Sequence, residues 1–135
     1  MNIARPLTSC LRVSALALAL ALGGTAMGKT GTPSNQTAGT QFTVTVRAVD
    51  DYFNLVPGIN DRIVLTSTDT FAWMPSDTVL VNGQCLIPTR LHKSGLQTIT
   101  ARDSTNSGIT PNTSSQVNVI GGTFARLLIL APGEF

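Results

Sequence analysis

The feature that most constrains this chain is a strict alternation of apolar and polar residues, which recurs in several short segments. Residues 41–48, for example, read QFTVTVRA. Successive side chains of a β-strand point to opposite faces, so a strand here would place its apolar side chains on one side. We expect such segments to be half-buried strands that share one core. The buried face of this strand would carry Phe42, Val44, Val46 and Ala48, and the other face Thr43, Thr45 and Arg47.

Later segments repeat this alternation, and turn-forming residues separate them. The pair Asn82-Gly83, between two apolar runs, is the strongest short-range hairpin signal in the chain. Pro88 cannot donate to a strand ladder, which favours an edge strand or a bulge at that point. Further inward positions are Ile63 and Leu65, then Cys85, Ile87, Thr89 and Leu91, then Ile99 and Ala101, then Val117 and Val119, with a short apolar strand at 78–81.

Six or seven short strands with frequent turns, and no amphipathic helix pattern between them, predict an all-β fold. The expected architecture is an immunoglobulin-like antiparallel β-sandwich of about seven strands. A sheet of βαβ units is excluded because the crossover helices are missing from the pattern.

The first 26 residues have the pattern of a secretory signal peptide. Arg5 and Arg12 give a positive start, an apolar run follows over residues 13–22, and Gly24 and Ala26 are small residues that suit cleavage after Ala26. The apolar run is about half of the roughly 20 residues that a membrane-spanning helix needs. We therefore expect an exported mature chain without a membrane span, secreted or held at the cell surface.

Charge and cysteine content change once this segment is removed. Of nine basic residues seven remain, against seven acidic ones, so the mature chain is close to neutral. Neither a phosphate-binding stripe nor a basic membrane face is present, and no nucleic-acid partner is expected. Only Cys85 remains of the two cysteines, which excludes an internal disulfide. Free cysteine is usually a small buried hydrophobe, and we interpret Cys85 in that way rather than as a reactive thiol.

The residue types of common catalytic sites are too few for an enzyme. His92 is the single histidine, and Cys85 precedes it by seven positions on one expected strand, which separates them by over 20 Å at about 3.3 Å per residue. Zinc requires several Cys or His ligands. Glu134 is the single glutamate, and no glycine-rich phosphate loop precedes a helix. No catalytic residue, metal ligand or cofactor is therefore expected.

Two other kinds of site stay open. Asp50, Asp51 and Asp103 could supply loop oxygens to calcium, although turn aspartates usually bond their own backbone. Carbohydrate binding is the second possibility, because exposed aromatic rings can stack on sugars or contact proteins. Its candidate contacts are Tyr52, Phe71 and Trp73. A single Trp in a sandwich more often packs across the core, so a buried Trp73 would favour a spacer and an exposed one a binding site.

Four stretches of the chain resemble the bacterial immunoglobulin-like modules that occur in tandem in invasins, adhesins and other long surface proteins. They are TAGTQFTVTVRAVDDYFNLVPG, IVLTSTD, HKSGLQTITARDSTNSG and SSQVNVIGG, within residues 36–121. Two positions depart from the usual pattern, with Phe53 where Gly is common and Ser94 where Ala is common. The resemblance implies a non-catalytic module that acts as a spacer or presents loops for adhesion. Its partners would be neighbouring modules, or a protein or glycan at a cell surface.

The two ends of the mature chain resemble the two sides of a boundary between such repeats. GKTGTP at 28–33 is similar to the linker that follows an opening strand, and FARLLILAPGEF at 124–135 is similar to an opening strand. The expected organisation is a signal peptide (1–26), an extended linker (27–40), the sandwich (41–121) and an extra C-terminal strand (122–135).

Two interpretations of this order remain. The chain is a piece of a longer repeat protein, since arrays need neighbours. Alternatively, residues 124–130 fill the place of the first strand, in their own sandwich or in that of another molecule. Contacts in that strand exchange would come from Phe124, Leu127, Leu128 and Leu130.

Overall fold

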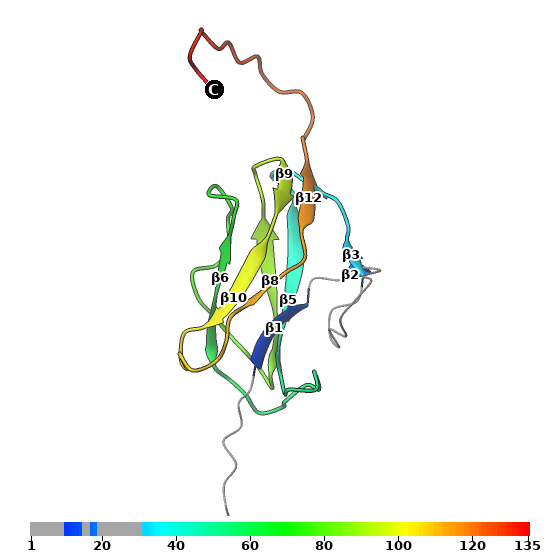
Figure 1. Ribbon diagram of the computed structural model, residues 1–135, viewed down its shortest axis with the longest axis vertical. Helices are drawn as coiled ribbons and strands as arrows, with labels where there is room; N and C mark the ends of the chain where they lie inside the picture. The colour runs from blue at the N-terminus through cyan, green and yellow to red at the C-terminus, as the bar shows by residue number, and fades with distance from the viewer. Residues whose placement is uncertain (1–9, 15–16, 19–30) are drawn as a thin grey trace, which may run out of the picture.

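A computed structural model of the chain describes residues 10–14, 17–18 and 31–135 (Figure 1). The described part folds into two packed layers of β-strands and contains no helix. The expected all-β sandwich is confirmed. No helix among the described residues is long and apolar enough to cross a membrane.

The first layer is a three-stranded antiparallel sheet with the spatial order β1 (Cys10–Ser14), β5 (Gln41–Val49) and β8 (Gln84–Arg90). Strand β8 pairs with β5 from Gln41↔Arg90 to Arg47↔Gln84. Strand β1 pairs with the other side of β5, from Cys10↔Val49 to Ser14↔Thr45.

The second layer contains two sheets, and the chain passes directly from one sheet to the other twice. Only Thr98 separates β9 from β10, and a short segment separates β11 from β12. One sheet has the order β11-β10-β6-β7, and the other has the order β4-β12-β9, in which β4 runs parallel to β12. A separate short pair joins β2 (Ala17–Leu18) to β3 (Thr32–Pro33). The remaining strands are β4 (Gln36–Thr37), β6 (Arg62–Ser67), β7 (Thr78–Val79), β9 (Gly95–Gln97), β10 (Ile99–Asp103), β11 (Asn112–Thr113) and β12 (Val117–Ile120).

The core lies between the layers and uses the side chains that the alternation selects. Each fully buried aliphatic side chain contributes about 1.5–3 kcal/mol relative to an exposed one. Phe42 and Cys85 are half-buried and pack against this core. Its buried members include Val44, Val46, Ala48, Ile63, Leu65, Leu80, Ile87, Ile99 and Ala101, with Leu91, Val117 and Val119 in a second cluster.

Asn82 and Gly83 form the predicted tight turn, although the segments on its two sides pair only at the bridge Val81↔Gln84, because β7 pairs with β6 and β8 pairs with β5. Both have positive φ, 50° and 78°, as the favoured two-residue hairpin turn requires. The amide of Val81 donates to the Gln84 carbonyl at 2.9 Å, and the amide of Gln84 donates back at 3.2 Å. The turn also packs closely, because a Cβ at Gly83 would lie 2.2 Å from the carbonyl oxygen of Val56. Glycine is therefore required here for two reasons.

The ends of the chain differ in part from the sequence-based expectation. The segment 27–40, predicted as an extended linker, contains β3 and β4, and β4 joins a sheet. The segment 122–135, predicted as an extra strand, has no strand partner among the described residues of this single chain and extends away from the sandwich (Figure 1). Strands β1 and β2 fall inside the predicted signal peptide, whose remaining residues lie outside the described part. The signal peptide therefore stays a prediction.

Candidate functional site

An exposed aromatic pair, Phe71 and Trp73, lies beside the end of β8. Phe71 is 73% exposed and Trp73 is 48% exposed. The backbone of Trp73 pairs with Arg90, whose amide donates to Trp73 and whose carbonyl accepts from it, at 2.9 and 2.8 Å. The Arg90 guanidinium carbon lies 5.3 Å from the centre of the Trp73 ring, within the range of a cation–π contact.

The aromatic pair is not one flat platform, and Tyr52 does not belong to it. Phe71 lies in a turn rather than in an extended strand, since the amide of Ala72 donates back to the Asp69 carbonyl at 3.1 Å. Tyr52 is 74% exposed but follows the far end of β5, whereas Arg90 is opposite Gln41 at its beginning. The eight steps from Gln41 to Val49 correspond to about 26 Å. The three candidate aromatics therefore form two separate surfaces.

Asp69 fixes the loop that carries the aromatic pair. No local sequence pattern indicated this role. This buried carboxylate accepts the amide of Phe71 through Oδ1 at 2.9 Å. Its Oδ2 accepts the amides of His92 at 2.5 Å and Lys93 at 2.9 Å. Burial acts to raise the pKa of Asp69, but the amides of Lys93, His92 and Phe71 outweigh it and the net pKa is lowered. Asp69 thus joins the end of β6 to the end of β8 across the two layers.

His92 and Cys85 take no part in a common site. His92 is exposed beyond the end of β8, with Nδ1 2.7 Å from the Phe71 carbonyl oxygen. Cys85 lies near the other end of that strand, opposite Val46. Burial raises the pKa of the Cys85 thiol to about 11, and the hydrogen bond with the Val46 backbone lowers it in part. Cys85 was expected to be buried; it is half-buried and packs against the core.

Two of the three aspartates considered for calcium, Asp50 and Asp103, accept nearby backbone amides. Asp50 accepts the amides of Tyr52 and Asn54, both at 2.9 Å, and the Asn54 side chain at 3.0 Å. Its pKa is lowered, first by the side chain of Asn54. In the part of the chain that the structure describes, no three Asp, Glu, Cys or His residues gather as metal ligands. Asp51 is exposed in the same turn.

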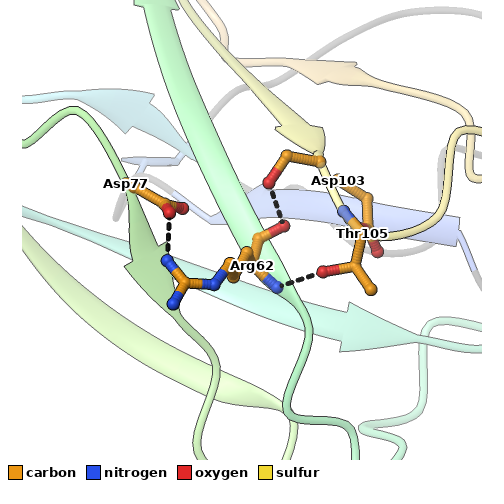
Figure 2. A network of polar contacts seen from close by, with 5 residues as sticks. Arg62, Asp77, Asp103 and Thr105 are labelled. Atoms are coloured by element: carbon orange, nitrogen blue, oxygen red, sulfur yellow. Dashed lines mark hydrogen bonds and ion pairs between the residues drawn. The ribbon is translucent and has the colours of Figure 1, made fainter.

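Asp103 belongs to a second polar network, at the start of β6 (Figure 2). Its Oδ1 accepts the amides of Thr105 and Asn106, both at 2.8 Å, and the Thr105 hydroxyl in turn accepts the Arg62 amide at 2.9 Å. The guanidinium of Arg62 points to the other side and pairs with Asp77 (Figure 2). That pair is solvent-exposed, and such pairs contribute about 0–1 kcal/mol.

A shallow hollow of about 250 Å³ opens next to this network, at the end of β10. Asp61, which lies near Asp103, has its pKa raised by burial first and then by the Asp103 charge. Among the residues that the structure describes, Asp103 is the single carboxylate that lines the hollow. The lining residues are Arg102, Asp103, Ser104, Ser107, Ile109 and Pro111.

Comparisons with known proteins identify a distant structural likeness. No protein-family model matches the chain, and no curated protein matches it. One similar solved structure is the crystal structure of domains 4 and 5 of the S-layer protein SbsC. The likeness has 19% sequence identity and a TM-score of 0.45, and it covers 71% of this chain and 49% of that chain. The present chain therefore spans about half the length of that structure, and a likeness at this level carries no conclusion about function.

Proposed function

We propose that this chain is a non-catalytic immunoglobulin-like module of an exported protein, secreted or held at the cell surface, which acts as a spacer or presents loops for adhesion. The observation that carries the proposal is the two-layer sandwich itself, from which the C-terminal segment leaves beyond β12 along the long axis (Figure 1). Modules of this kind can be joined end to end into a rod.

The pairing registers place the exit of the chain beside the start of β5. Ile120, the last residue of β12, accepts a hydrogen bond from Ala38 at 2.9 Å, just before β5 begins. The opposite end of the sandwich, at Val49, is about 26 Å away along β5. A module of this kind needs adjacent modules as its partners rather than a substrate.

The loop carboxylates also fit a structural role. Asp50, Asp69 and Asp103 each accept two or more backbone amides, so their charges stabilise turns. Carboxylates held in this way have few free lone pairs for a ligand.

Small-angle X-ray scattering tests the spacer role on proteins that contain one, two and three copies of residues 27–135 in tandem. For a rod, the maximum dimension increases by the same amount with each added copy. A radius of gyration that follows the compact-globule relation, growing as about the 0.38 power of residue number, would contradict the spacer role.

Export is tested separately, by expressing the full chain and sequencing the N-terminus of the protein recovered outside the cytoplasm. Cleavage after Ala26 gives a chain that begins at Met27. Recovery of the chain inside the cell with Met1 intact would contradict both the signal peptide and the proposed location.

Carbohydrate binding is the second candidate function, and the exposure of Phe71 and Trp73 is the observation that favours it. Titration of immobilised glycans with the wild-type chain and with Trp73→Ala tests this role, with Tyr52→Ala as a matched control on the distant surface. Binding that is lost in Trp73→Ala and kept in Tyr52→Ala would establish an aromatic sugar site. If the wild-type chain binds no glycan, this candidate is wrong and the spacer role is unaffected.

A further inference from the structure

Strand β1 covers one edge of β5, and the predicted removal of residues 1–26 would uncover that edge. Strand β1 pairs with residues 45–49 of β5 and also lies against β10 and β11 of the other layer. All of β1 belongs to the segment 1–26 that the sequence predicts to be removed. Removal would leave this edge without a neighbour and would uncover one side of the core.

The backbone geometry shows which groups become unpaired. The amide of Ala48 donates to Gly83 on the β8 side at 2.8 Å. Backbone groups of a strand point alternately to its two sides, so those of Thr45, Arg47 and Val49 are directed toward β1. Unpaired groups in a row are a template for pairing with another strand.

The C-terminal segment, in contrast to this edge, is an apolar extended chain that pairs with no strand among the described residues. Leu127 and Leu128 are 88% and 80% exposed, and Phe124 and Ile129 are also exposed. Monomeric proteins rarely expose so many large apolar residues together unless they form an interaction site.

We propose that residues 124–130 of one mature chain add as an antiparallel strand to the β5 edge of a second copy, in the place that β1 occupies in the structure. The inference rests on the proposed function, because it identifies a second copy of this chain as the adjacent module. Backbone hydrogen bonds would supply affinity, and the side chains facing the core would supply specificity.

The position of Arg126 decides which face of the donated segment is buried. Residues 10–14 read CLRVS and residues 124–128 read FARLL, with one arginine at the same position. In the register of β1, Arg12 is opposite Arg47, whose side chain is exposed. Arg126 in that place would also lie on the outer face, whereas the other phase would bury its charge at a large cost.

This register places three apolar residues of the donated strand over the core. Ala125, Leu127 and Ile129 would then be opposite Ala48, Val46 and Val44, all of which are buried. Phe124, Leu128 and Leu130 would face outward. The two adjacent leucines, Leu127 and Leu128, therefore have different roles although both are exposed in the single chain.

The direction of the strands favours a second copy over the chain's own sandwich. The place of β1 begins beside Val49, at the opposite end of β5 from Ile120. That distance is about 26 Å, whereas the four steps from Ile120 to Phe124 reach at most about 14 Å. The segment instead leaves the sandwich along its long axis (Figure 1), toward where the entry end of a following copy would lie.

Such pairing is head-to-tail, since each copy donates at one end and accepts at the other. Contacts of this type give open chains when no rotation closes them into a ring. The mature chain is therefore expected to form linear oligomers whose length increases with protein concentration.

Sedimentation velocity of the mature chain, residues 27–135, tests the proposal with Leu127→Asp against Leu128→Asp. The two variants add the same charge at adjacent exposed positions. We expect Leu127→Asp to weaken association by about 100-fold or more, because it places a charge over the core. Leu128→Asp should change it by less than about 3-fold, as for other surface positions. A wild-type chain that stays monomeric at every concentration, or two variants with equal effects, would overturn the proposal.

A second measurement covers the case in which the unassociated chain does not fold. A peptide of residues 122–135 is added to the Leu127→Asp chain, and amide exchange is followed by NMR. The wild-type peptide should restore the fold and slow the exchange of Thr45 and Arg47, and a peptide with Leu127→Asp should not. Equal exchange with both peptides would contradict strand addition. The scattering of covalent tandem copies is independent of this result, so a failed inference remains distinguishable from a failed spacer role.

Discussion

In the sheet β1-β5-β8, the outer edge of β8 and the edge of β5 that faces β1 are covered in different ways. On the β8 edge, the chain's own residues pair with Gln84 at one end, through Val81, and with Arg90 at the other, through Trp73. Pro88 lies between them and has no amide hydrogen to offer. On the β5 edge, the cover is β1, which lies in the segment predicted to be cleaved. On the predicted cleavage of residues 1–26, the β8 edge would keep its cover and the β5 edge would lose it.

The cover of a strand edge can therefore come from the same sandwich or from a segment outside it. Natural sheets protect their edges with proline, short strands or covering segments, and the β8 edge has the proline and the covering segments. Strand β5 alternates regularly over residues 41–48 and has no such device of its own. In the strand addition proposed above, residues 124–130 of a second copy would close this edge.

The hairpin that closes the β8 edge should give the largest effect when altered. Gly83→Ala is expected to destabilise the protein by about 3 kcal/mol, because positive φ and a clash with the Val56 carbonyl act together. Chemical denaturation measures this change in the free energy of unfolding. Gly58→Ala is the matched control, since Gly58 has a φ of 83° and open space around its Cβ position. It should cost about 1 kcal/mol, and equal losses in the two variants would show that the clash is unimportant.

Asp69 provides the next effect, since it holds the segment that follows β8. Asp69→Asn is expected to cost about 2 kcal/mol at neutral pH, because a neutral amide replaces a carboxylate that accepts three amides. The pKa of Asp69 is lowered in the folded state, so its stabilisation is present above the unfolded pKa. It is lost as the pH falls through the folded value. Denaturation at several acidic pH values should show a smaller slope in Asp69→Asn, and an unchanged slope would contradict this role.

On the β5 side, Phe53 occupies a backbone position that suits glycine. Its φ is 69°, in the left-handed region that side chains with a Cβ rarely adopt. Phe53→Gly and Phe53→Ala both remove the ring, but only glycine relieves the backbone strain. We expect the Gly variant to be more stable than the Ala variant by about 1 kcal/mol, as measured by their thermal unfolding. A more stable Ala variant would show that this turn changes its conformation when the ring is removed.

The contact between Trp73 and Arg90 should have the smallest effect, because Trp73 is half-exposed. A double-mutant cycle with Trp73→Ala and Arg90→Ala is expected to give a coupling free energy of about 0.5 kcal/mol. A coupling near zero would indicate that the ring is free to bind another molecule, and the β8 edge would then be held by backbone bonds alone.

The sequence predicted those features of the fold that depend on local patterns. Alternation identified the buried faces of β5, β6, β8, β10 and β12, and the Asn82-Gly83 pair identified the tight turn. The edge position of Pro88 also followed from its missing amide hydrogen. Each of these depends on residues within a few positions of one another, and the structure confirms them.

The remaining features depend on residues far apart in the chain. Strand β4 has two residues, Gln36 and Thr37, which are too few to show a period, and its partner is 83 positions away at Val119 and Ile120. Two of the amides that donate to Asp69, those of His92 and Lys93, lie 23 and 24 positions later in the chain. Phe71 and Trp73 were candidates from the sequence, but the turn at Phe71 and the separation from Tyr52 required the fold. Long-range register is not encoded in a local pattern.

The parallel pairing of β4 with β12 has a mechanical consequence for a rod under tension. A pull toward the preceding module acts on the start of β4, and a pull toward the following module acts on the end of β12. The two strands run in the same direction, so these forces slide them past each other rather than peeling them apart. The bond from Ala38 to Ile120 and those of the adjacent ladder are then loaded together, and rupture requires all of them to break at once. Although it is short, this pair is well placed to resist stretching.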